Sequence, residues 1–151
     1  MKQARPVFLL ILRLLIGGVL FYAGLMKALG PSAEFAAAIE TYHLLPAALI
    51  TPLALGLPWI EMWVGIFLAA GFQRRLAAAA ALVLFIVFLT AVGSALARGL
   101  DLSSCGCFGA DAMAPKHTLI LDSVLAFLTI MLLAFPERRP LFALDTFLSK
   151  D

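Results

Sequence analysis

Hydrophobic residues along the chain are gathered into four long blocks, and shorter segments between them hold most of the charged residues. The blocks cover about 7–26, 47–72, 76–97 and 119–135. Each is close to the roughly 20 residues that an α-helix needs to cross the hydrocarbon core of a bilayer. No alternation of period two is present, and a helix satisfies its own backbone groups in lipid. The pattern therefore predicts four membrane-spanning helices in a single domain, 1–151.

The first connection predicts one further element. The stretch Glu34 to Tyr42 is typical of a short helix at the membrane surface, ended by Leu45-Pro46. The expected fold class is an all-α membrane protein, a four-helix bundle with this interfacial helix in its first outer loop. The first block follows Lys2 and Arg5, as the apolar part of a signal peptide would. It continues past Arg13 for a full span with no convincing cleavage site, so we expect it to be retained.

The positions of Lys and Arg predict the orientation, because cytoplasmic loops of membrane proteins are enriched in these residues. If both termini lie on one side, that side holds seven basic residues and the other side three. The seven are Lys2, Arg5, Arg74, Arg75, Arg138, Arg139 and Lys150, and the three are Lys27, Arg98 and Lys116. We therefore expect cytoplasmic termini, with the two longer connections facing the exterior.

Composition supports a membrane protein and argues against one class of partner. Apolar residues make up 64% of the 151 residues and charged residues 13%, against about 45–50% and 25% in soluble domains. The formal net charge is only +2, and the basic residues lie at block ends rather than in a patch. We therefore expect the protein to be surrounded by the lipid bilayer and not to bind nucleic acid.

The chain has two cysteines, Cys105 and Cys107, separated by Gly106 in the second outer connection. Disulfides persist outside the cytoplasm, and the glycine permits the turn that would bring the thiols together. So small a ring is strained, which makes a disulfide labile and oxidising, and it adds little loop-closure stability. Redox chemistry is the favoured interpretation. Metal binding and a structural turn stay open.

Neighbouring residues bear on both the redox and the metal interpretation. Lys116, His117 and the start of the fourth span would lower a thiol pKa, whereas Asp101 and Asp111 act in the opposite direction. Two thiolates with His117 or His43 would suit a soft ion such as Cu(I). A structural zinc site uses four ligands, and the chain has no further cysteine. We therefore assign no metal ligand, and soft-metal binding remains an alternative.

Charged residues inside the spans are the other candidates. Glu61 lies about 16 Å from the cytoplasmic end of the second span, and Arg13 lies about 9 Å deep in the first. A buried carboxylate faces the bundle interior and is a functional candidate. Either Arg13 pairs with Glu61, or Glu61 handles protons or a ligand. Lys27 is expected to extend to the headgroups, and Asp122 to cap the fourth span or to accept from His117.

Four motifs together indicate a family. In chain order they are Ala23-Gly24-Leu25-Met26-Lys27, Tyr42-His43-Leu44-Leu45-Pro46, Leu57-Pro58-Trp59-Ile60-Glu61 and Cys105-Gly106-Cys107-Phe108-Gly109. In their order and spacing the chain resembles the MauE branch of the DoxX-like membrane proteins. The resemblance implies a four-helix bundle of the bacterial inner membrane that supports redox maturation of periplasmic proteins. It implies a thioredoxin-like or disulfide-rich partner and, from the wider group, a quinone as the cofactor to consider.

These observations lead to one functional hypothesis and two alternatives. The hypothesis is a membrane thiol–disulfide redox protein that supports maturation of a periplasmic partner, as in methylamine utilisation. Cys105 and Cys107 would carry the exchange, and Glu61 would belong to a site in the bundle. The first alternative is a small transporter or soft-metal-handling protein, with Glu61 on the path of the ion. The second is a non-catalytic assembly factor that docks a partner.

Overall fold

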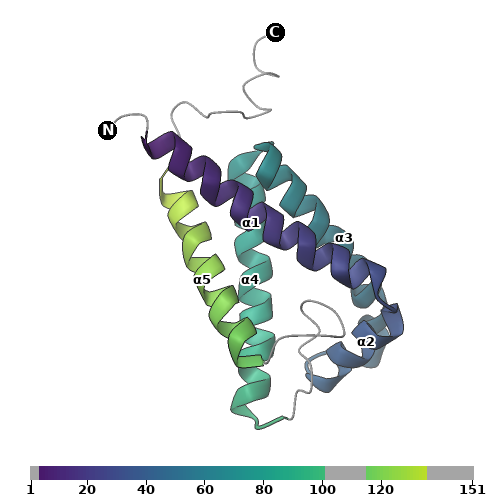
Figure 1. The fold of residues 1–151 in the computed structure, drawn as a ribbon. Helices are drawn as coiled ribbons and strands as arrows, with labels where there is room; N and C mark the ends of the chain where they lie inside the picture. Colours follow the sequence, from purple (N-terminus) through teal and green to yellow (C-terminus); the bar gives the residue numbers. More distant parts are fainter. Residues whose placement is uncertain (1–3, 101–114, 136–151) are drawn as a thin grey trace.

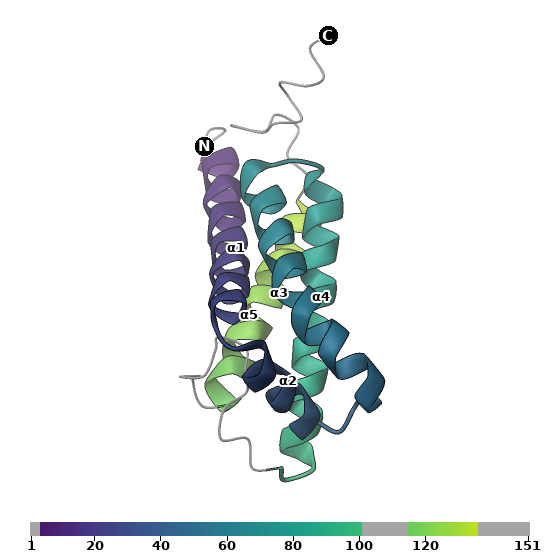
Figure 2. The same cartoon turned by 90° about the vertical axis from the view of Figure 1, so that its right-hand side faces the viewer.

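The computed structural model describes residues 4–100 and 115–135, which form a bundle of helices (Figure 1). No strand is found in these two ranges. The helices are α1 (Ala4–Leu29), α2 (Ser32–Thr41), α3 (Ala47–Ala70), α4 (Arg74–Ala97) and α5 (Pro115–Ala134). The four long helices run side by side. The short α2 lies at the end of the bundle where α1 and α4 end and where α3 and α5 begin (Figure 2). The expected all-α fold is confirmed, including the short helix.

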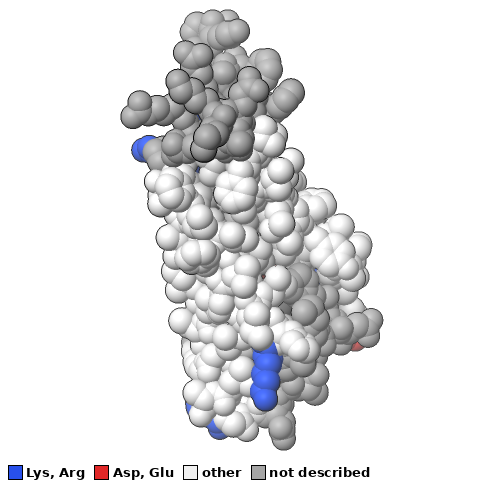
Figure 3. Space-filling view, turned by 60° about the vertical axis from the view of Figure 1, so that its left-hand side comes forward, with Lys and Arg blue, Asp and Glu red and all other residues white. Residues whose placement is uncertain are grey.

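All four long helices are able to cross a membrane. The qualifying stretches are Pro6–Leu29, Ala47–Ala70, Arg74–Ala97 and Lys116–Ala134, each with at least 19 residues and high mean hydropathy. A helix of 20 residues spans about 30 Å, the thickness of a hydrocarbon core. The outer surface of the bundle is largely hydrophobic. On the face drawn in Figure 3, Lys and Arg show only toward the two ends. The chain is a multi-pass membrane protein.

Glycine allows α1 and α3 to pack closely. A Cβ added at Gly17 would lie 2.7 Å from the carbonyl oxygen of Gly65, and one at Gly24 would lie 2.6 Å from that of Pro58. Small residues permit such backbone approach, which drives helix association in lipid. Helix α3 continues through Pro52 and Pro58 without interruption. The backbone contacts therefore fix the register of α1 against α3.

Helix α4 packs mainly against α5. Its buried side includes Ala77, Ala78 and Ala81, small residues like those that bring α1 to α3. Large side chains fill the centre of the bundle, among them Ile16, Leu20, Leu68, Phe85 and Leu125. The hydrophobic core therefore runs along the whole bundle and holds two tightly packed helix pairs together.

The short helix α2 is attached to both pairs. Its Ile39 packs with Ile50 of α3, and Tyr42, directly after α2, packs with Val92 of α4 and Leu100. The Arg98 guanidinium also donates a hydrogen bond to the backbone oxygen of Tyr42. Helix α2 therefore covers the end of the bundle between α3 and α4. Through Tyr42, the end of α2 contacts Arg98 and Leu100, which directly precede segment 101–114.

Candidate functional site

A buried ion pair joins α1 to α3. Glu61 of α3 is 0% exposed, and Lys27 of α1 is 4% exposed. The Lys27 ammonium donates to both carboxylate oxygens, with Nζ 2.8 Å from Oε1 and 2.7 Å from Oε2. The prediction that Glu61 faces the bundle interior is confirmed. Both charges are removed from solvent, so each depends on the other for compensation.

The interpretation in which Arg13 pairs with Glu61 was wrong. Arg13 precedes Lys27 by 14 positions on the same helix, which separates them by about 21 Å along the axis. An arginine side chain does not cover that distance. The expectation that Lys27 extends to the headgroups was also wrong. Its ammonium is directed to Glu61 and is enclosed by the rings of Phe35 and Phe88, whose centroids lie 5.8 and 5.1 Å from Nζ.

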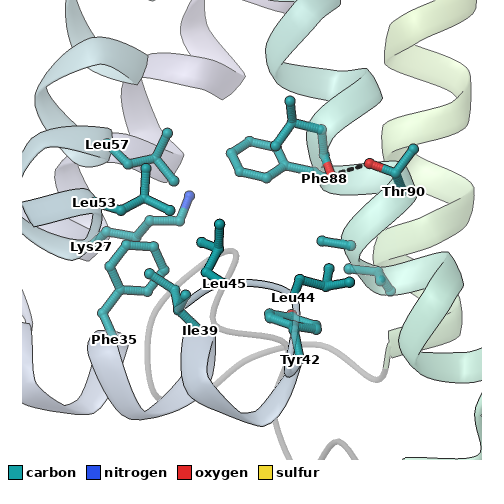
Figure 4. Close-up of a pocket in the computed structure, with 13 residues that line it drawn as sticks. Lys27, Phe35, Ile39, Tyr42, Leu44, Leu45, Leu53, Leu57, Phe88 and Thr90 are labelled. Carbon is teal, nitrogen blue, oxygen red and sulfur yellow. Dashed lines mark hydrogen bonds between the residues drawn. The ribbon is translucent and has the colours of Figure 1, made fainter. Parts of the chain in front are cut away.

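Lys27 also faces a cavity of about 190 Å³ that is covered by α2 (Figure 4). Its walls come from α1, α2, α3, α4 and the segment after α2. The lining residues are Lys27, Phe35, Ile39, Tyr42, Leu44, Leu45, Leu53, Leu57, Val87, Phe88, Thr90, Ala91 and Val92. Among these, Lys27 is the charged residue, and the Thr90 hydroxyl donates to backbone oxygens of its own helix. The cavity is therefore a hydrophobic space with an ammonium on its wall.

Part of the cavity wall extends to the outer surface of the described helices. Leu44, Leu45, Leu53 and Val87 line it and are also exposed on the outer surface. In a membrane, this surface of the described helices would face lipid, which is the side from which a hydrophobic molecule would approach. A lysine ammonium has three N–H donors. Beside the aromatic rings of Phe35 and Phe88, it suits a flat ligand with an oxygen acceptor.

The remaining predicted residues are scattered. His43 is exposed and has φ 47°, a left-handed conformation that ends α2. Lys116 and His117 are exposed in the first turn of α5. Asp122 is buried, about two turns beyond the start of α5, so it does not cap that helix. His117 and Asp122 face different surroundings, and the structure gives no hydrogen bond between these two residues. Arg13 is buried at the opposite end of the bundle.

Cys105 and Cys107 lie outside the described residues, and so do Asp101 and Asp111. The segment 101–114 that contains them starts after Leu100 and ends before Pro115. Within residues 4–100 and 115–135, no group of three possible metal-ligating side chains is found.

Sequence reasoning did not pair Lys27 with Glu61. The signal was the set of small residues along α1 and α3. Gly17 lies against Gly65, and seven residues later Gly24 lies against Pro58 and Glu61. Lys27 follows Gly24 by three positions, one turn along the same face. Antiparallel packing in this glycine register therefore brings the lysine within reach of the carboxylate.

Comparison with known proteins assigns a family to this arrangement. The family model described as "Methylamine utilisation protein MauE" matches residues 5–135. The chain belongs to the MauE family. Two curated relatives are named methylamine utilization protein MauE. The one from Methylophilus methylotrophus is 35% identical over 102 residues, which cover 68% of this chain and 53% of the relative. The one from Methylorubrum extorquens is 33% identical over 105 residues, 70% and 56% of the two chains.

The MauE-family chain spans about half the length of these curated relatives. No solved structure matches it. The matched region includes α1 to α5 and the segment with both cysteines. Lys27, Glu61 and the cavity residues therefore lie within the region that the family model matches.

Proposed function

We propose that this MauE-family protein is a thiol–disulfide redox protein of the bacterial inner membrane that supports maturation of a periplasmic partner. Both termini are cytoplasmic in this proposal, and Cys105 and Cys107 are periplasmic. The observation that carries it is the Cys105-Gly106-Cys107 sequence in the connection from α4 to α5. A pair with one intervening residue suits exchange better than it suits holding a fold. The relatives' name, methylamine utilization protein, supports a role in that process.

The proposed exchange is balanced between this chain and its partner. The thiols of Cys105 and Cys107 are oxidised to a disulfide while a disulfide of the partner is reduced to two thiols, or the reverse. Two electrons and two protons change sides through a mixed disulfide in which one sulfur of each protein is joined. The partner is a thioredoxin-like or disulfide-rich periplasmic protein.

The cavity covered by α2 is the proposed binding site for a quinone. When bound, a quinone would accept the two electrons and two protons released as the thiols form a disulfide. Lys27 would donate a hydrogen bond to a carbonyl oxygen, and Phe35 and Phe88 would pack against the ring. Glu61 would hold the ammonium in place and keep its charge compensated. The fit rests on the apolar walls, the single ammonium and the exposed lining residues described above.

Trapping of the mixed disulfide tests this proposal. In membranes, Cys107→Ser leaves one thiol and is expected to accumulate an adduct with the partner through Cys105. Dithiothreitol should release the adduct, and mass spectrometry should then identify a periplasmic protein. The matched control Ser104→Ala leaves both cysteines and should give no adduct. If Cys107→Ser traps nothing and Cys105→Ser/Cys107→Ser still supports maturation, the protein is an assembly factor instead. Soft metal retained stoichiometrically would support the transporter alternative.

A further inference from the structure

A groove of about 460 Å³ runs between α2 and α3. Most of its lining residues are exposed, so it opens on the outer surface of the bundle. Small side chains form much of its walls, among them Ala33, Ala36 and Ala37 of α2 and Ala47, Thr51 and Ala54 of α3. Glu40, in the last turn of α2, is the charged residue of this lining. Small residues at a helix surface leave room for the larger side chains of another helix.

Helix α5 has the complementary surface. Ile120, Phe127 and Ile130 are large, hydrophobic and more than 49% exposed. Lys116 precedes Ile120 by one turn and is exposed as well. The spacings of four, seven and three residues place all four side chains on one face of the helix. The helices that pack against α5, α4 and α1, leave this face uncovered.

Glu40 and Lys116 carry opposite charges at the same end of the bundle, where α2 lies and α5 begins (Figure 1). Both are exposed, and neither makes an ion pair with another side chain in the described part of the chain. Helices α3 and α5 each pack against α1 and α4, so they lie diagonally across the bundle. The groove beside α3 and the exposed face of α5 therefore point to different sides, and a second copy is needed to bring them together.

The membrane restricts how two copies meet. Copies inserted in one orientation lie side by side, so two surfaces fit only if they lie at the same depth. Helices α3 and α5 both begin at the end where α2 lies (Figure 2). Ile120 is about 8 Å from the first residue of α5, and Thr51 in the groove is about 6 Å from that of α3. Phe127 and the exposed Trp59 are each about 18 Å along their helices. The large residues of α5 thus match the groove and the exposed side of α3 in depth.

We propose that copies of this chain associate side by side, with α5 of one copy seated in the groove between α2 and α3 of the next. Lys116 of one copy pairs with Glu40 of its neighbour, and Ile120 enters the groove between the small side chains. The two surfaces lie on different sides of the bundle, so the contact is head-to-tail, and a suitable rotation closes it into a ring. The interface contains neither the cysteines nor the cavity covered by α2, so it is independent of the proposed redox function.

Cross-linking between labelled copies tests the contact directly. Unlabelled and ¹⁵N-labelled protein are mixed in mild detergent and reconstituted together into lipid vesicles. A carbodiimide joins a carboxylate to a neighbouring amine without a spacer, so it should form an amide between Glu40 and Lys116. Mass spectrometry should find linked peptide pairs in which one peptide is labelled and the other is not, because the two residues come from different copies.

Variants measure what each part of the interface contributes, with sedimentation equilibrium in mild detergent as the assay. Ala37→Phe fills the groove and should weaken association at least tenfold. Ala48→Phe changes an exposed alanine of α3 outside the groove lining and should associate like the unchanged protein. Glu40→Lys and Lys116→Glu should each weaken association about fivefold, and the double variant should restore it because the charges are exchanged. All four positions are exposed, so these changes should leave the fold of each copy intact.

Four results would overturn the proposal. The first is an unchanged protein that sediments as a monomer and gives no cross-link with mixed labels. The second is a Glu40–Lys116 link confined to peptides of one label, which would place both residues in a single copy. The third is equal association of Ala37→Phe and Ala48→Phe, or a double charge variant no better than the single ones. The fourth is a monomer that retains a phospholipid or another protein and loses it in Ala37→Phe, which would make that molecule the occupant of the groove.

Discussion

Removing either member of the Lys27–Glu61 pair should destabilise the bundle strongly. Both side chains are almost fully buried, 1% and 0% exposed, and two hydrogen bonds join them. Lys27→Met leaves a carboxylate between α1 and α3, and Glu61→Leu leaves an ammonium there. A stranded buried charge costs about 3–5 kcal/mol of unfolding free energy. We expect each single variant to lose that amount.

The double variant Lys27→Met/Glu61→Leu removes both charges and should recover most of the loss. Replacement of a buried ion pair by apolar residues of similar volume is often neutral or stabilising by about 1–4 kcal/mol. Unfolding in detergent by increasing dodecyl sulfate, followed by helical circular dichroism, measures all four proteins. Lys116→Met and Glu40→Leu change exposed residues and are the matched controls, expected to alter stability by less than about 0.5 kcal/mol.

The same cycle separates structure from function. If the pair only holds α1 to α3, the double variant should regain both stability and partner maturation. If Lys27 and Glu61 also serve a ligand in the cavity, the double variant should be stable and inactive, which is the result we predict. Single variants that each lose less than about 1 kcal/mol, or a double loss equal to their sum, would refute the reasoning about a coupled buried pair.

Three further predictions follow from the packing, the charges and the cavity. Gly17→Ala should lose about 1–3 kcal/mol in the same unfolding assay because its Cβ would lie 2.7 Å from a backbone oxygen of α3, whereas Gly18→Ala enters open space and should not. A reporter fused after Asp151 should be active in the cytoplasm, and periplasmic activity would reverse the assigned orientation. Ala91→Phe should fill the cavity covered by α2 and reduce quinone binding, measured by fluorescence quenching, at least tenfold relative to the outward-facing control Ala79→Phe. Equal binding by the two variants would show that a quinone does not bind in this cavity.

The spans were predictable because each is a block of about the length that a bilayer requires. The short helix was also predictable, since α2 (Ser32–Thr41) nearly coincides with the expected stretch from Glu34. Helix ends were less so. Helix α1 continues to Leu29, and this extra turn puts Lys27 inside the helix rather than at its end. The lysine therefore belongs to the packed interior rather than to the membrane surface.

Partner choice was the harder problem because it depends on the register between helices. Depth along each span suggested Arg13 for Glu61, but glycine contacts between α1 and α3 set the register and select Lys27. The cavity was not predictable either, because its walls come from four helices and the segment after α2. Cys105 and Cys107 were found from their motif alone, and their role stays a prediction.

A redox titration of Cys105 and Cys107 tests the central claim most directly. The purified protein is equilibrated with defined glutathione or dithiothreitol mixtures, free thiols are alkylated, and the mass of the protein gives the oxidised fraction. We predict a reversible two-electron transition at a relatively oxidising potential, which is lost in Cys105→Ser and unchanged in the neighbouring Ser104→Ala. A disulfide that never forms, or one that stays inert to every thiol while Cys105→Ser still supports maturation, would contradict a redox function for this protein.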